Sequence, residues 1–247
     1  MLIDSHCHFD FFPENEQSAI WQRAKIAGLE TLIVPAVEKA NWQATAEVCE
    51  RFPFYAAYGL HPIYYHQKAD ILALDEWLTR YKAVAVGECG LDYAVEIEPK
   101  VQQFFFEAQV ELSISHQLPL ILHARRALEQ VLQTLARYPK AKFVVHTFTG
   151  SDKQLEKLLS LGGYIGIGGT STYPRAQRLR RQLATVPKER YLLETDAPDQ
   201  PLYGHQGKVN EPEKVAEVAS VLAELRDEGI AEVMAQSTQN SKAFFSL

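Results

Sequence analysis

The chain has 247 residues, 47% hydrophobic and 23% charged, and its 25 basic and 31 acidic residues give a formal net charge of −6. This composition is typical of a soluble globular protein with a sizeable core, and it argues against a surface built for nonspecific nucleic-acid binding. The length suits either one large α/β barrel or two small domains. A polyanionic substrate would need a local positive site, which a metal centre can supply.

The cysteine content and the hydropathy pattern predict a cytoplasmic protein. Cys7, Cys49 and Cys89 are too few and too widely spaced for a disulfide framework, which fits a reducing compartment. The sequence shows no basic stretch followed by an apolar segment, so it predicts no signal peptide. No apolar run is long enough to span a bilayer. We therefore expect no membrane association, and no obligatory protein partner is evident.

Short β-rich runs alternate with amphipathic helical patterns along the chain. The predicted strands cover residues 2–4, 31–36, 55–59, 83–87, 119–122, 142–145, 164–168 and 191–194. Most are almost continuously apolar, as expected for parallel strands that are buried on both faces. The predicted helices cover residues 17–27, 42–51, 71–80, 100–116, 127–138, 152–161, 176–184, 213–226 and 230–245.

Eight strands, each followed by a helix, are the pattern of a (β/α)8 TIM barrel, which we predict as a single domain over residues 1–247. The competing architecture, an open doubly wound sheet, more often has fewer strands. In a (β/α)8 barrel the active site lies at the carboxyl ends of the strands. Polar residues that follow the predicted strands are therefore the candidate functional residues.

Six of the eight predicted strands end in His, Glu or Asp. His6 and His8 share one face of an extended chain because successive side chains alternate. The other residues in such positions are His61, Glu88, His123, His146 and Asp196. A lone histidine after a strand is more often a structural residue, but so many ionisable groups at one end of a barrel are costly to desolvate without pairing or a metal. The joint pattern favours a metal centre.

Four histidines and two carboxylates are too many ligands for one tetrahedral ion. They suffice for two ions about 3.5–4 Å apart that share a bridging carboxylate. The predicted ligands are His6, His8, Glu88, His123, His146 and Asp196. Glu88 lies between the two histidine pairs in strand order, so we predict that it bridges, and Asp196 could also accept a proton from the attacking water. Both carboxylates are predicted to be catalytic.

Three further residues are predicted to contact the substrate. His61 follows a strand like the ligands, although a hydrogen-bonding role behind the ligands is an open alternative. Arg125 follows His123 by two residues and could hold a phosphate bidentately, unless it is an exposed arginine at a helix start. Arg175 is the residue nearest the site in the basic stretch 175–190.

The segments that carry these residues resemble the TatD family of metal-dependent hydrolases. The matching segments are HCHFD at 6–10, GLHP at 59–62, GECGLD at 87–92, LPLILH at 118–123, HTFTG at 146–150 and ETDAP at 194–198. The match continues to NSKAFF at 240–245, so it covers essentially the whole chain. The segments YPRA at 173–176 and APDQPL at 197–202 look most like the YjjV subgroup.

This resemblance implies an amidohydrolase-type TIM barrel, a divalent-metal site made by the six residues named as ligands, and phosphodiester hydrolysis. DNA is the substrate usually assigned to the family, often for an exonuclease. We therefore expect two divalent ions (Zn, Mg or Mn) and a deoxyribonuclease acting on DNA ends or short oligonucleotides. The loops 94–96 and 197–200 depart from the family's common forms.

Two alternatives remain at this stage. An amidohydrolase or lactonase acting on a small molecule could use the same metal site, because fold and metals do not fix the substrate. A metal-binding or scaffold protein with a vestigial site is the non-enzyme alternative, and the intact ligand set argues against it.

Overall fold

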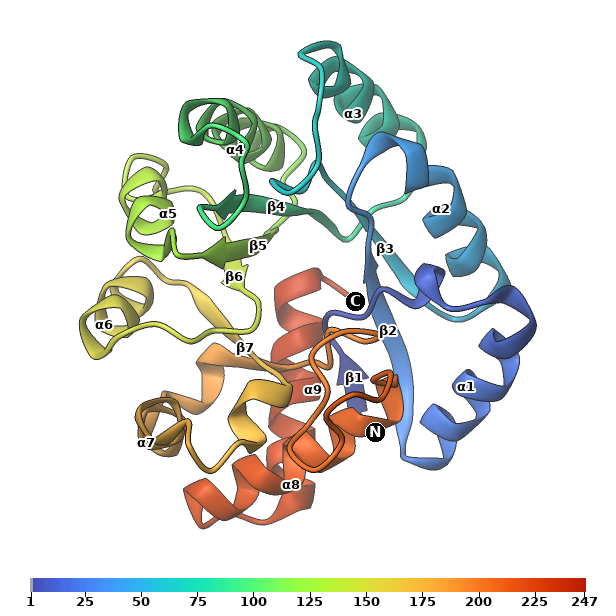
Figure 1. Ribbon diagram of the computed structural model, residues 1–247, viewed down its shortest axis with the longest axis vertical. Helices are drawn as coiled ribbons and strands as arrows, with labels where there is room; N and C mark the ends of the chain where they lie inside the picture. The colour runs from blue at the N-terminus through green and yellow to red at the C-terminus, as the bar shows by residue number, and fades with distance from the viewer. Residues whose placement is uncertain (1) are drawn as a thin grey trace.

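The structure, a computed structural model, describes residues 2–247 and contains eight parallel strands that follow one another in chain order around a barrel (Figure 1). This arrangement confirms the predicted (β/α)8 fold. The strands are β1 (Leu2–Asp4), β2 (Leu29–Pro35), β3 (Tyr55–Tyr58), β4 (Ala85–Asp92), β5 (Leu120–Arg125), β6 (Phe143–Val145), β7 (Tyr164–Ile167) and β8 (Tyr191–Leu193).

Figure 1 shows helices in an outer ring around these strands, with the last helix nearer the centre of the view. They are α1 (Glu14–Ile26), α2 (Trp42–Arg51), α3 (Ala69–Arg80), α4 (Pro99–Ser115), α5 (Leu128–Leu135), α6 (Asp152–Ser160), α7 (Gln177–Thr185), α8 (Val215–Arg226) and α9 (Ile230–Phe245). Short 3-10 turns occur at η1 (Phe9–Phe11), η2 (Lys39–Asn41), η3 (Gly169–Thr172), η4 (Lys188–Arg190) and η5 (Pro212–Lys214). Within residues 2–247, no helix has the length and apolar character needed to cross a membrane.

The core has two apolar parts. The larger cluster lies between the strands and the surrounding helices, and the smaller one gathers buried residues from six strands. Phe244 and Phe245, at the end of α9, belong to the smaller cluster together with Ile33, Ile121 and Leu192. The end of α9 therefore packs against the strands from inside the ring, away from the carboxyl-end site described below.

The barrel closes between β8 and β1 through individual hydrogen bonds. The Ser5 amide donates to the Leu193 carbonyl at 2.9 Å, and the Asp196 amide donates to the His6 carbonyl at 2.9 Å. The buried Asp4 carboxylate reinforces this seam, because it accepts hydrogen bonds from the Thr195 amide (3.0 Å) and hydroxyl (2.6 Å). Burial raises the pKa of Asp4 to about 7, although the bonds from Thr195 and His6 oppose the shift. The seam places His6 beside Asp196.

Two buried glutamines on α4 hold the main chain beside the site. Gln109 accepts from the Leu60 amide at 2.7 Å and donates to the Leu60 carbonyl at 3.1 Å. Gln102 makes the same pair of bonds with Asp92, both at 2.7 Å. Each side chain thus replaces a neighbouring strand as hydrogen-bond partner, and α4 fixes the residues next to His61 and at the end of β4.

Two strands extend past their predicted carboxyl ends. β4 continues past residue 87 to Asp92, and β5 continues past residue 122 to Arg125. The extensions pair with each other, with Gly90 opposite His123 and Asp92 opposite Arg125. A Cβ on Gly90 would lie 2.1 Å from the His123 carbonyl oxygen, so only glycine permits this approach. Glu88 and His123 therefore lie within strands, which fixes their side chains more rigidly than loops would.

We expect Gln109→Leu to lower the free energy of unfolding by about 2–4 kcal/mol, since it leaves the buried amide and carbonyl of Leu60 unpaired. Urea denaturation measures this change. The matched control is Gln133→Leu, which alters an exposed glutamine bonded to Glu129 and should stay within about 0.5 kcal/mol of the parent protein. Equal stabilities of the two variants would contradict the bracing role of Gln109.

Candidate metal centre

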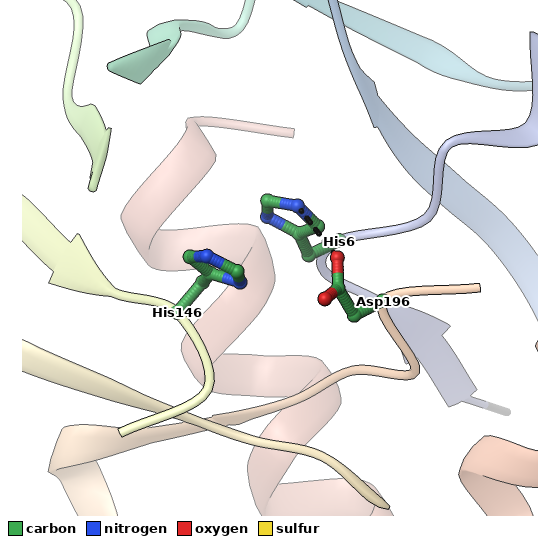
Figure 2. Close-up of side chains that lie close together, drawn as sticks. All are labelled: His6, His146 and Asp196. Atoms are coloured by element: carbon green, nitrogen blue, oxygen red, sulfur yellow. Dashed lines mark ion pairs between the residues drawn. The ribbon is translucent and has the colours of Figure 1, made fainter. Parts of the chain in front are cut away.

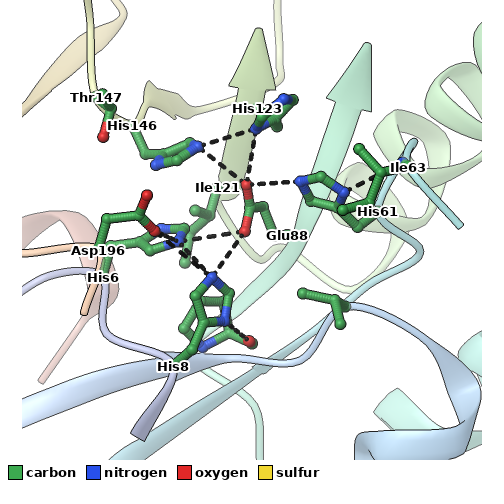
Figure 3. Close-up of polar contacts among 12 residues, drawn as sticks. His6, His8, His61, Ile63, Glu88, Ile121, His123, His146, Thr147 and Asp196 are labelled. Atoms are coloured by element: carbon green, nitrogen blue, oxygen red, sulfur yellow. Dashed lines mark hydrogen bonds and ion pairs between the residues drawn. The ribbon is translucent and has the colours of Figure 1, made fainter. Parts of the chain in front are cut away.

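Six side chains from five strand ends converge at the carboxyl end of the barrel. Figure 2 shows that His6, His146 and Asp196 face one another, although they follow β1, β6 and β8. Figure 3 shows the Glu88 carboxylate between the histidines, with His6 and His8 on one side and His123 and His146 on the other. The structure thus brings together all six predicted ligands.

The first donor set consists of His6 Nε2, His8 Nε2, Glu88 Oε2 and Asp196 Oδ1. His6 Nε2 lies 3.2 Å from Glu88 Oε2, 3.3 Å from Asp196 Oδ1 and 3.3 Å from His8 Nε2. His8 Nε2 lies 3.3 Å from Glu88 Oε2 and 3.6 Å from Asp196 Oδ1. Ligands around a tetrahedral ion with bonds of about 2.0–2.1 Å are about 3.3–3.4 Å apart. These five distances are therefore close to those between the ligands of a tetrahedral ion.

The second donor set uses the other oxygen of the same carboxylate. Glu88 Oε1 lies 2.9 Å from His146 Nε2 and 3.2 Å from His123 Nδ1, and these two nitrogens are 3.2 Å apart. Three donors at such distances can hold an ion and leave a position open for water or substrate. Because its two oxygens face different histidine pairs, Glu88 has the geometry of a bridging ligand.

The charges of the cluster are strongly coupled. Burial alone would raise the pKa of Glu88, but His61, His146 and His6 hold it well below its usual value. Burial likewise opposes ionisation of Asp196, yet its bond to His6 and the charges of His146, His6 and His8 bring its pKa down to about 2. The two carboxylates are thus anionic, and their burial requires positive charge nearby. Divalent ions would supply this charge by replacing the protons on the histidine rings.

Hydrogen bonds at the far side of two rings orient their metal-facing nitrogens. His8 Nδ1 lies 3.0 Å from the Pro35 carbonyl oxygen, which leaves His8 Nε2 facing the carboxylates. His123 Nε2 lies 3.0 Å from Asp92 Oδ2, which directs His123 Nδ1 toward Glu88. Although burial opposes it, the bonds to Asp92 and Glu88 raise the pKa of His123 to about 9.

Sequence reasoning did not identify Asp92 as the partner of His123. The usable signal is the period of two from Glu88 through Gly90 to Asp92, which places Glu88 and Asp92 on one face of a continuing strand. That signal could not be used once the strand was predicted to end at residue 87.

Glu194 is a second buried carboxylate beside the donor sets. It accepts hydrogen bonds from the Thr147 amide (2.5 Å) and hydroxyl (3.0 Å), and its Oε1 lies 3.8 Å from His146 Nδ1. A Cβ on Gly166 would lie 2.2 Å from Glu194 Oε2, so the glycine leaves room for this carboxylate. Glu194 therefore fixes the turn that carries His146.

His61 lies against the second donor set as a hydrogen-bond donor. Its Nδ1 accepts the Ile63 amide at 3.2 Å, so the ring proton is on Nε2, which donates to Glu88 Oε1 at 3.0 Å. Burial lowers the pKa of His61 to about 4, which keeps the ring neutral. In this tautomer His61 has no lone pair for a metal at Nε2.

An open cleft of about 550 Å³ lies over the two donor sets. Phe11, Val37, Ile63 and Tyr64 contribute apolar surface, and the polar lining residues outside the donor sets include His61, Arg125, Arg126, Thr147, Thr149, Thr170, Asp199 and Gln200. His61 and Arg125 are thus placed where a substrate would lie. Arg175 is not among the cleft-lining residues and lies in a separate hollow with Tyr173 and Tyr203.

Comparison with known proteins places the chain in one family. The family model described as TatD related DNase matches residues 3–246. The chain is 42% identical to an uncharacterized metal-dependent hydrolase, YjjV, of Escherichia coli strain K12, over 100% of this chain and 98% of that protein. The crystal structure of the E. coli YjjV, a TatD homologue, superposes with a TM-score of 0.94, covering 100% of this chain and 98% of that one.

A more distant relative carries a specific name. The chain is 31% identical to the 3'-5' ssDNA/RNA exonuclease TatD of Erwinia tasmaniensis, over 94% of each chain. Similarity at 17% identity and a TM-score of 0.68 to an organophosphorus hydrolase mutant from Deinococcus radiodurans shows the shared fold alone. Because the family model covers the chain and a full-length relative is more than 30% identical, the protein belongs to the TatD family of metal-dependent hydrolases.

Proposed function

We propose that the protein is a two-metal phosphodiesterase that hydrolyses DNA ends or short single-stranded oligonucleotides, as an exonuclease does. The observation that carries this proposal is the division of the Glu88 carboxylate between two donor sets, with Oε2 facing His6 and His8 and Oε1 facing His123 and His146. Two ions held in this way suit an in-line displacement at phosphorus. The name of the Erwinia relative supports the same substrate class.

The donor chemistry favours Zn²⁺ over Mg²⁺, because imidazole nitrogens outnumber carboxylates in the two sets. Bound ions would polarise the phosphoryl group and lower the pKa of an attacking water. The protein's own residues would position the reactants. Asp196 presents Oδ1 to the first set, so its second oxygen is free to orient the water, and Arg125 would hold phosphoryl oxygens. His61 would line the substrate cleft while its Nε2–H keeps Glu88 in place.

We expect two ions per chain in protein reloaded with Zn²⁺ or Mn²⁺ and one ion per chain in His123→Ala, because only the second donor set loses a ligand. Elemental analysis of dialysed protein measures this stoichiometry. His205→Ala, which changes a histidine paired with Glu217 outside the cluster, should retain both ions. A single ion in the parent protein at saturating metal would refute the two-metal centre.

Asp196→Asn should reduce turnover of a phosphodiester by roughly 10²–10⁴-fold, the usual contribution of a general acid–base group. The substitution keeps the shape and one ligand oxygen but removes the charge and most of the basicity. Steady-state kinetics at saturating metal, with circular dichroism as the control for folding, measure the effect. Near-normal turnover would leave Asp196 with a structural role only.

Binding of single-stranded DNA should depend weakly on salt, because the net charge of −6 favours a short, local contact. With about −0.7 per neutralised phosphate, contact with two or three phosphates predicts a slope of about −1.4 to −2.1 in log K against log salt. Fluorescence anisotropy between 50 and 200 mM salt, roughly the range over which such slopes are resolved, provides the measurement. A much steeper slope would indicate an extended footprint and count against recognition of ends.

A substrate panel separates this proposal from the small-molecule alternative. The parent protein should hydrolyse bis-p-nitrophenyl phosphate and thymidine oligonucleotides in preference to amides and lactones. Efficient turnover of an amide or a lactone without phosphodiesterase activity would favour the amidohydrolase or lactonase alternative.

A further inference from the structure

A second hollow of about 360 Å³ lies beside the metal cleft, between the loops that follow β7 and β8. Five residues line it: Tyr173, Pro174, Arg175, Tyr203 and Gln206. None of the five is acidic, and Arg175 supplies a positive charge. The hollow therefore combines aromatic surface with a cation in a chain whose overall charge is negative.

The aromatic residues are arranged around the arginine. The Arg175 guanidinium carbon lies 5.2 Å from the centre of the Tyr173 ring, and the Tyr173 and Tyr203 rings are 5.8 Å apart at 71°. The Tyr203 side chain is 57% exposed. A stacked guanidinium keeps its outward donors available for an anion, and an exposed ring offers a face for stacking.

The two loops that line the hollow also contribute residues to the metal cleft, and they run side by side. Gly169 lies so close to Gln200 that a Cβ would be 2.3 Å from the Gln200 carbonyl oxygen. Farther along, the Tyr203 amide donates to Thr172 Oγ1 at 2.9 Å and Tyr173 Oη donates to the Pro201 carbonyl at 2.8 Å.

One end of each loop lines the cleft, through Thr170 and Gln200, and the other end lines the hollow. The three residues from Thr170 to Tyr173 span at most about 11 Å. A polymer held in the cleft can therefore reach the hollow with its next units.

We propose that this hollow is a second substrate site, which binds the nucleotides of a single strand that adjoin the scissile phosphate. A base stacks on the exposed Tyr203 ring, and Arg175 donates hydrogen bonds to a backbone phosphate while its guanidinium stays stacked on Tyr173. The inference rests on the proposed phosphodiesterase function, because that function brings a strand into the cleft. Aromatic stacking with a nearby cation is the sequence-tolerant way in which proteins hold single strands.

Binding to oligonucleotides of two lengths tests this site. The assay uses the Asp196→Asn protein, in which hydrolysis is expected to be roughly 10²–10⁴-fold slower. An unlabelled thymidine dinucleotide or dodecanucleotide competes with a fluorescein-labelled dodecanucleotide, and fluorescence anisotropy reports the binding. The measured quantity is the affinity ratio between the long and the short strand. We expect Tyr203→Ala to lower this ratio by about 5- to 150-fold, the range reported by alanine substitution at stacking residues.

Three further variants separate stacking from general charge effects. Tyr203→Phe keeps the ring and should keep the ratio. Arg175→Ala should lower the ratio and reduce the salt slope by about 0.7, the value for one phosphate contact to a single strand. Arg181→Ala removes an exposed arginine of α7 that does not line the hollow, and it should change neither quantity.

An unchanged ratio in both Tyr203→Ala and Arg175→Ala would overturn the proposal, as would an equal loss in Arg181→Ala. Hydrolysis of bis-p-nitrophenyl phosphate by the parent protein is measured in parallel. Phosphodiester hydrolysis without any preference for the longer strand contradicts the second site alone. Length-dependent binding through Tyr203 without phosphodiester hydrolysis contradicts the proposed function alone.

Discussion

The Glu88 carboxylate, buried at the carboxyl end of the barrel, is the group around which the rest of the site is arranged. Five histidine rings approach it: His6 and His8 at Oε2, and His61, His123 and His146 at Oε1. A buried carboxylate is unfavourable unless it is neutralised and hydrogen-bonded. The surrounding scaffold therefore has to hold the histidine rings in place. The ring nitrogens and the Glu88 oxygens have the spacing of metal ligands.

The scaffold does so with buried polar groups of its own. Asp4 binds Thr195 across the β1–β8 seam, which holds His6 and Asp196 together. Asp92 is hydrogen-bonded to His123, and Glu194 accepts hydrogen bonds from the turn that carries His146. On α4, Gln102 and Gln109 hydrogen-bond the main chain beside the site. Such outer contacts fix the orientation of ligand rings, on which metal affinity depends. Several of these hydrogen bonds join a side chain to the main chain of a segment far away in the sequence. They therefore depend on the tertiary fold rather than on local sequence.

The cleft and the neighbouring hollow divide the recognition of a substrate into two parts. The cleft over the donor sets is lined by apolar surface and by one basic group in particular. Phe11, Ile63 and Tyr64 supply the apolar surface, and Arg125 supplies the basic group. The hollow adds Arg175 and Tyr203, which are reached only because the loops after β7 and β8 lie side by side. In the proposed function, a chain of net charge −6 attracts phosphate through a few placed cations and a metal centre.

The sequence by itself determined the barrel and the six candidate ligand residues that converge at its carboxyl end. The alternation of apolar runs with amphipathic helices predicts eight βα units. Because the strands are parallel, the residues at their carboxyl ends lie at the same end of the barrel. For this reason His6, His8, Glu88, His123, His146 and Asp196 could be named without coordinates.

Tertiary structure decided which oxygen of Glu88 faces which histidine pair, and that His61 donates a hydrogen bond instead of binding as a ligand. It also decided the lengths of β4 and β5, because polar residues at the site interrupt the apolar pattern that marks a strand. Arg175 was separated from the cleft by loop packing, which depends on contacts between segments far apart in the chain and leaves no periodic signal in the sequence.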